Sequence, residues 1–168
     1  MLLSSPGTLN AGSAGTFQNL ATCERNGCTW PSSSVQRDMS SVSFPSGGQQ
    51  LPGRGFYEIS GLAWSGGGAI RRVEVSTDGG RRWNNAEIKG TAHRMAHTRF
   101  GFMWNWDGQE TELQSRCTDE LGQVQPSRAQ IAKYWNRPFD ATFSVPGLDN
   151  SIQPWRIASD GTLTNGFA

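Results

Sequence analysis

Long hydrophobic runs are missing from this 168-residue chain, and charge of either sign is scarce. No apolar segment approaches the roughly 20 residues that cross a bilayer, so the sequence predicts no membrane span. The opening residues, MLLSSPGTLNAGSAG, lack a basic segment and a long apolar core, so we expect no signal peptide in this chain. The formal net charge of +1 gives no general attraction to nucleic acid, and we expect no nucleic-acid partner.

Cysteine is also rare, with three in the whole chain. Cys23 and Cys28 form a C-x4-C pair, which suits either a disulfide or half of a metal site. A zinc site needs four ligands, and no second cysteine pair or nearby histidine follows, so the pattern does not favour metal. Cys117 lies within the strand-like run ELQSRCTDE, where we expect a small buried side chain rather than a nucleophile.

The motifs of common hydrolases and nucleotide-binding proteins are absent as well. His93 and His97 stand four apart in HRMAH, but the glutamate of a zinc-protease motif is missing. The run WSGGGAIRRVEVS leads from glycines into a strand pattern without a lysine, which predicts a strand-to-strand turn with positive φ and not a phosphate loop. Asp119 and Glu120 end a strand before a glycine turn, where acidic residues are common for structural reasons. These motifs therefore indicate no catalytic, cofactor-binding or metal-binding residue.

Glycine, tryptophan and alternating strand patterns are what the chain has in quantity, with 21 Gly and 7 Trp. Residues 56–64 carry apolar side chains at both odd and even positions, which predicts a strand covered on both faces. Residues 69–76 and 81–88 flank the turn signal Asp78-Gly79, which predicts a β-hairpin. Arg71 and Arg72 fall on opposite faces of the first of these strands, so we expect one of them to point inward or toward a partner.

The clearest strand pattern is TRFGFMWNWDG, where every second residue is aromatic. Phe100, Phe102, Trp104 and Trp106 share one face, and we expect the two tryptophans to lie on the core side. Further strand patterns cover residues 110–120 and 152–159. About seven short strands with turns between them, and no alternating helices, predict an antiparallel β-sandwich.

The chain changes character near residue 36. Residues 1–35 are rich in Ser, Gly, Thr and Asn without hydrophobic periodicity, which predicts a disordered N-terminal tail. The sandwich is expected over residues 36–158, with residues 159–168 as a C-terminal tail. A long irregular stretch from about 121 to 150 contains one helical turn, SRAQIAKYW, with Ser127 as its N-cap. We expect Tyr134 and Trp135 in this stretch to face an interface or a further domain.

Several ordered motifs together resemble a known family. The segments GLAWSGGGAIRRVEVSTDGGRRWNNAEI, WNWDG, LQSRCTDELGQVQP and NSIQPWRI resemble the C-terminal dimerisation domain of the sulfite oxidase family of molybdenum enzymes, and SVSFPSGGQQLPGRGFYEISG fits its bacterial sulfane dehydrogenase branch. The resemblance covers about residues 37–158. It implies an immunoglobulin-like β-sandwich that pairs two subunits into a homodimer.

The resemblance also carries expectations about chemistry. In that family a preceding domain holds molybdenum-molybdopterin through a catalytic cysteine, and we expect no cofactor site in this chain. An arginine of the late irregular segment leans toward the substrate oxyanion in the family's sulfite oxidases. A gapped match through YWNRP gives Arg137 that substrate-binding role, whereas an ungapped match puts Val145 there and leaves Arg137 as a surface arginine. The resemblance further implies a periplasmic location and a c-type cytochrome as electron acceptor.

Two main functions follow, and a third is weaker. The favoured function is the dimerisation domain, as a fragment, of a molybdenum-dependent sulfite or sulfane oxidoreductase; we expect this chain alone to be inactive. The alternative is a stand-alone immunoglobulin-like module that binds another protein through its aromatic strand. A complete small enzyme is the weakest interpretation, because nucleophile and cofactor signals are missing.

Overall fold

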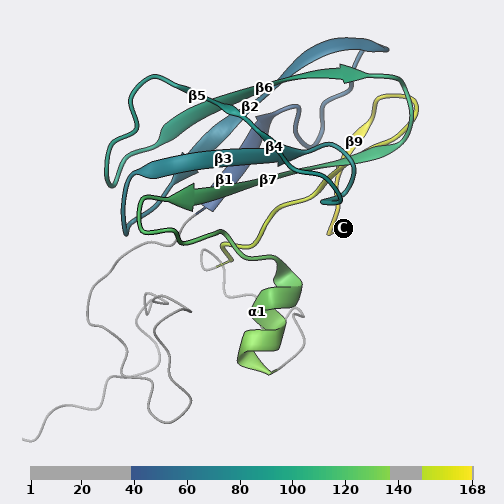
Figure 1. Ribbon diagram of the computed structural model, residues 1–168. Helices are drawn as coiled ribbons and strands as arrows, with labels where there is room; N and C mark the ends of the chain where they lie inside the picture. Colours follow the sequence, from purple (N-terminus) through teal and green to yellow (C-terminus); the bar gives the residue numbers. More distant parts are fainter. Residues whose placement is uncertain (1–38, 137–148, 168) are drawn as a thin grey trace, which may run out of the picture.

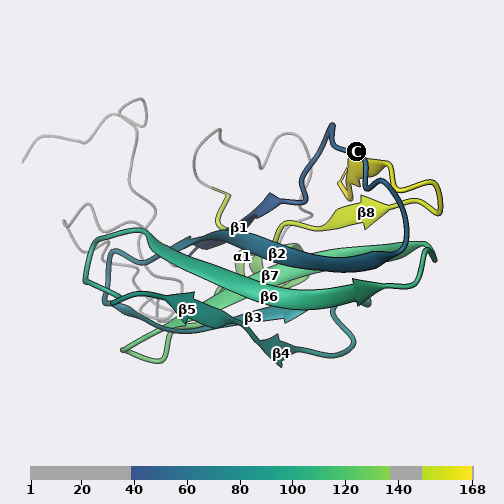
Figure 2. The ribbon, with the colours of Figure 1, turned by 90° about the horizontal axis from the view of Figure 1, so that it is seen from above.

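The computed structural model describes residues 39–136 and 149–167, which form two antiparallel sheets packed face to face (Figure 1). The first sheet has the strand order β1-β2-β6-β5, with β1 at Met39–Phe44, β2 at Gly55–Trp64, β6 at Thr98–Trp106 and β5 at Glu87–Lys89. The second has the order β4-β3-β7-β8-β9, with β4 at Asn84–Asn85, β3 at Ile70–Ser76, β7 at Thr111–Asp119, β8 at Trp155–Ile157 and β9 at Leu163–Asn165. Seen from above, β2 and β6 lie over β7 and β3 (Figure 2). The predicted all-β, immunoglobulin-like antiparallel sandwich is confirmed.

The aromatic strand faces the core as predicted. Phe100 and Trp106 are almost fully buried, and Phe102 and Trp104 pack against the core with part of their surface exposed. Because a strand alternates its side chains, the residues between them point outward, and Met103 is 65% exposed. The period of two in the sequence therefore fixed both faces of β6.

The prediction for β2 holds on one face only. Tyr57, Ile59 and Ala63 belong to or pack against the core. On the other face Trp64 is half-buried, with its ring edge against His97 at a centroid distance of 5.1 Å. Phe56 at the far end of that face is 77% exposed. Apolar residues on both faces of β2 thus do not mean that both faces are covered in the single chain.

The predicted hairpin at Asp78-Gly79 forms, but its second arm divides between the sheets. β4 pairs with β3, with Asn84 opposite Val75. The chain then leaves the second sheet, and β5 pairs with β6 in the first. The Asp78 carboxylate accepts hydrogen bonds from the backbone N–H of Arg82 and the hydroxyl of Ser76, and these bonds lower the pKa of Asp78.

The C-terminal segment differs from the sequence prediction. Residues 159–168 were expected as a tail, yet they include β9, which pairs with β8 and places Leu163 in the core. The strand is only three residues long and buries one side chain, so its pattern is too short to recognise.

The helix α1, Arg128–Trp135, is capped by Ser127 as predicted, and Gln130 completes a capping box. Within the described residues, no helix is long and apolar enough to span a membrane.

A buried amide ties distant parts of the sandwich together. Gln125 Oε1 accepts hydrogen bonds from the Ser40 backbone N–H at 2.9 Å and the Ser40 hydroxyl at 2.7 Å. Its Nε2 donates to the Ser151 carbonyl at 3.1 Å, and the Ser40 and Ser115 hydroxyls are 2.9 Å apart. Gln125 therefore joins β1, β7 and the segment before β8, and all four residues are buried.

Replacing Gln125 tests this network. Gln125→Ala should lower the free energy of unfolding by about 2–4 kcal/mol, because it leaves several buried polar groups without partners. The matched control, Gln123→Ala, replaces a half-buried glutamine that hydrogen-bonds to Asp119 through its backbone, and it should cost less than about 0.5 kcal/mol. Urea unfolding followed by tryptophan fluorescence measures both, and equal losses would contradict the assignment.

Candidate functional site

A β-bulge turns two consecutive arginines to the same side of β3. The register of β3 against β7 shifts between Ile70 and Arg72. Ile70 and Val73 are buried, whereas Arg71 and Arg72 between them are both exposed. Neither arginine points inward, because the bulge inserts a residue and breaks the alternation, and the other expected alternative, an arginine that points toward a partner, stays a prediction.

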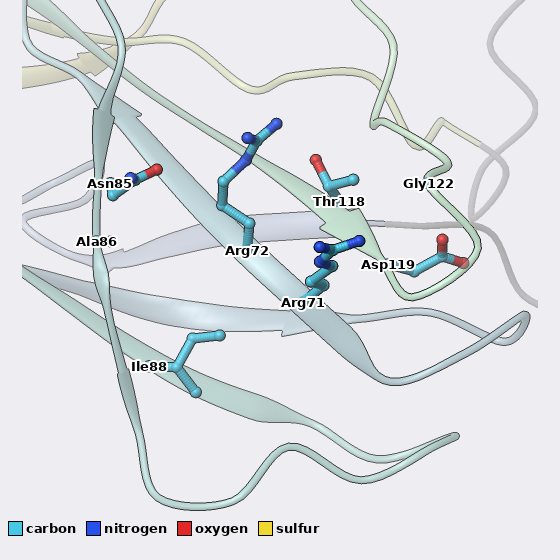
Figure 3. A pocket seen from close by; sticks show the side chains of 8 residues that line it. All are labelled: Arg71, Arg72, Asn85, Ala86, Ile88, Thr118, Asp119 and Gly122. Atoms are coloured by element: carbon cyan, nitrogen blue, oxygen red, sulfur yellow. The ribbon is translucent and has the colours of Figure 1, made fainter.

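The two arginines line a hollow of about 510 Å³ (Figure 3). Their side chains leave β3 on the same side, with Thr118 and the β7 end on one flank and the β4–β5 connection on the other. The residues that line the hollow are Arg71, Arg72, Asn85, Ala86, Ile88, Thr118, Asp119 and Gly122. Its volume is in the range of small-molecule sites in proteins.

Charge around the hollow is unevenly balanced. Oε2 of Glu74 lies 2.9 Å from Nε of Arg116 and 3.5 Å from Nε of Arg72, so two guanidinium groups share one carboxylate. The Arg116 guanidinium also lies 4.2 Å from the centroid of the Trp83 ring. No ion pair to Arg71 is found among the described residues. The outer face of β3 is thus rich in positive charge.

Asp119 is fully buried, and its carboxylate joins two loops. It accepts from the Ser65 hydroxyl at 3.1 Å and from the backbone N–H groups of Leu121 and Gln123 at 2.9 and 3.0 Å. The Ser65 hydroxyl in turn accepts from the backbone N–H groups of Gly67 and Gly68. The structural role predicted for Asp119 is consistent with these contacts.

The glycines of the SGGG turn serve a different purpose from the predicted one. Gly66, Gly67 and Gly68 do connect β2 to β3, but none of them has a positive φ. A Cβ on Gly68 would lie 2.6 Å from Cγ of Glu120, and one on Gly67 would lie 3.2 Å from the Asp119 carboxylate. Close approach of the two loops, and not left-handed backbone, favours glycine here.

The outer face of the β1-β2-β6-β5 sheet carries two large and strongly exposed apolar side chains, those of Phe56 and Met103. Phe56 is opposite Asn105 in the β2–β6 register, so Met103 is its diagonal neighbour on the same face. Beside them Lys89 Nζ lies 2.8 Å from Glu58 and 3.1 Å from Glu87. The hydrogen bond to Glu58, followed by the one to Glu87, raises the pKa of Lys89. Apolar contact surface with a charged border is typical of protein interfaces.

Several residues named from the sequence lie outside the described ranges. Arg137, Val145, Cys23 and Cys28 are among them, so their predicted roles stay predictions. Tyr134 and Trp135 form the last residues of α1.

The predictions for other titratable residues can be compared with the structure. Cys117 is fully buried, as predicted, and its thiol contacts Gln125 Oε1 at 3.9 Å. His93 and His97 are both exposed. Across residues 39–136 and 149–167, no group of three or more His, Cys, Asp or Glu could hold a metal ion.

Sequence reasoning missed the hollow and the Phe56–Met103 pair. The pair depends on which β6 residue stands opposite β2, and the hollow depends on the bulge, so both need the strand register. The adjacent arginines were the one local signal for the hollow, and the odd–even rule assigned them to opposite faces.

Comparisons with known proteins converge on one family. The profile described as the Mo-co oxidoreductase dimerisation domain matches residues 33–138. Mitochondrial sulfite oxidase of Rattus norvegicus is 39% identical over 88 residues, which are 46% of this chain and 15% of that protein. Sulfite oxidase of Gallus gallus is 34% identical over 103 residues, which are 58% of this chain and 22% of that protein. This chain thus spans less than a quarter of either relative.

A solved structure supports the same similarity. The sulfane dehydrogenase SoxCD from Paracoccus pantotrophus matches with a TM-score of 0.66 and 39% sequence identity. The match covers 77% of this chain and 32% of that one. The two-sheet architecture and the sequence therefore point to the same relatives.

The Asp119 carboxylate can be tested by a substitution that keeps its shape. Asp119→Asn should lower the free energy of unfolding by about 1–3 kcal/mol, because an amide offers one acceptor oxygen to three donors. Glu120→Gln is the control: Glu120 is exposed and pairs with Arg94 at 3.3 Å, so its loss should cost less than about 1 kcal/mol. Chemical denaturation measures both, and a neutral Asp119→Asn would show that the carboxylate does not hold the loops.

Proposed function

Because the chain belongs to the family of the Mo-co oxidoreductase dimerisation domain, we propose that it joins two copies of a molybdenum-dependent sulfite or sulfane oxidoreductase. The observation that carries the proposal is the family match over residues 33–138, together with a sandwich similar to part of SoxCD. The chain would act by binding a second copy of itself, with the redox chemistry performed elsewhere in the oxidoreductase.

The outer face of the β1-β2-β6-β5 sheet is the surface we assign to this contact. Phe56 and Met103 are exposed neighbours there, and aromatic residues and methionine are enriched in interface cores. In a two-fold dimer the same patch meets itself, so two such pairs would come together. Both outer faces carry ion pairs, but on the other sheet the pairs of Glu74 with Arg72 and Arg116, and of Glu112 with Arg156, lie on the strands themselves without an exposed aromatic residue or methionine beside them among the described residues. Interface cores are enriched in aromatic residues and methionine and depleted in glutamate, which favours the face with Phe56 and Met103.

The described residues do not fit a molybdenum cofactor. The one cysteine among the described residues is Cys117, and its thiol is fully buried against Gln125, where no cofactor can reach it. No step of the reaction is therefore assigned to these residues. The substrate, whether sulfite or sulfane sulfur, a c-type cytochrome as acceptor and a periplasmic location remain proposals. Their support is the similarity to a sulfane dehydrogenase and to sulfite oxidases.

Sedimentation of the full chain over a concentration series tests the dimer. If the interface is obligate and buries roughly 2,000 Å² or more in total, the chain should sediment with the mass of a dimer even at concentrations well below about 100 μM. A mass of one chain throughout that range would contradict the proposal. No specific observation favours the stand-alone binding module over this function.

A paired substitution tests the assigned face. Phe56→Ser with Met103→Ser should weaken the dimer by at least about tenfold, because hot-spot residues cluster at interface centres. The control, Leu121→Ser with Val124→Ser, removes two exposed apolar side chains near the end of β7 and should change the dissociation constant less than about threefold. Equal effects, or an effect of the control alone, would place the interface elsewhere while leaving dimerisation intact.

A further inference from the structure

We propose that the hollow lined by Arg71 and Arg72 binds an oxyanion of the sulfate or carboxylate type. The inference does not depend on the proposed dimer, because the two arginines that carry it lie on β3 of the other sheet, away from Phe56 and Met103. It begins with the bulge in β3, which directs two adjacent guanidinium groups to one side of the strand. Bulges of this kind often re-aim side chains next to functional sites.

A buried hydroxyl without a partner is the second observation. Thr118 stands directly opposite Arg72 in the β3–β7 register, so the two side chains share the outer face of the sheet. Thr118 is 7% exposed, and its hydroxyl has no hydrogen-bond partner among the described residues. Figure 3 shows the hydroxyl oxygen on the side toward Arg72. A buried polar group of this kind costs free energy unless a ligand satisfies it.

The negative charges near the hollow are already engaged. The Asp119 carboxylate receives the Ser65 hydroxyl and two backbone N–H groups. Glu74 is shared by Arg72 and Arg116. Arg72 still keeps half of its side-chain surface exposed, and the one carboxylate that it contacts within the described residues, Glu74, lies 3.5 Å away. The three guanidinium groups of Arg71, Arg72 and Arg116 outnumber the two carboxylates of Glu74 and Asp119, so a net positive charge remains around the hollow.

The chemistry of the lining selects the ligand class. A guanidinium group donates two parallel hydrogen bonds to an oxyanion, and a second guanidinium with a hydroxyl can meet its remaining oxygens. Asn85 adds an amide, while Ala86 and Ile88 form an apolar wall. A free sulfate ion and the carboxylate of an acidic peptide both present negatively charged oxygen acceptors to the guanidinium groups, so the experiment separates these two sources.

Titration calorimetry of the full chain with sodium sulfate, against sodium chloride at matched ionic strength, tests the site. We expect saturable sulfate binding that Arg71→Gln with Arg72→Gln weakens by at least about tenfold. The control is Arg81→Gln with Arg82→Gln, which removes the same charge from two adjacent exposed arginines in the β3–β4 turn. It should change the dissociation constant less than about twofold, because distant surface charges are screened.

A second variant and a second probe complete the test. Thr118→Val removes the hydroxyl with little change in shape, should weaken binding by about threefold or more, and keeps the test decisive if the double arginine variant fails to fold. A glutamate-rich peptide titrated in parallel identifies the source. Binding of either probe that depends on Arg71, Arg72 and Thr118 supports the site. Binding of neither probe, or equal weakening by both arginine pairs, overturns it.

Discussion

The sandwich depends most directly on one buried amide, that of Gln125. A two-layer β domain must close its corners without leaving backbone groups unpaired, and this corner gathers segments from across the chain. The side chain of Gln125 accepts hydrogen bonds from the backbone N–H and the hydroxyl of Ser40 in β1, and it donates one to the carbonyl of Ser151 before β8. With Ser115 of β7 in the same cluster, the N-terminal strand, the central strand and the returning segment share one polar centre. Such a network fixes their relative positions more sharply than apolar packing alone.

The core and the Gln125 cluster hold the two sheets together, and the outer faces of the sheets remain as the surfaces that can bind a ligand or a second copy of the chain. Asp119 holds the SGGG turn and the turn after β7 together, so the bulge at the start of β3 lies beside a fixed loop. One outer face then offers positive charge in a hollow, and the other offers Phe56 and Met103. We therefore assign an anion to the positively charged hollow and a second copy of the chain to the face that carries Phe56 and Met103.

The sequence predicted the features that repeat locally. The aromatic alternation of β6, the cap of α1 at Ser127 and the turn at Asp78-Gly79 all appear in the structure, because each depends on residues only a few positions apart. The Ser40–Gln125 contact joins residues 85 apart, and no local pattern signals it. The bulge at Arg71 and the diagonal pairing of Phe56 with Met103 depend on strand register, which the odd–even rule takes as regular. β9 was missed because a strand of three residues has too few positions to show a period.

Oxidative footprinting of the unmodified chain tests the assigned dimer face most directly, because two exposed methionines serve as probe and internal reference. Met103 is 65% exposed on the outer face of the β1-β2-β6-β5 sheet, and Met95 is 76% exposed in the loop before β6. As the chain is concentrated from monomer to dimer, the account predicts that oxidation of Met103 slows while that of Met95 stays constant. Unchanged oxidation of Met103 at concentrations where the chain sediments as a dimer would contradict it.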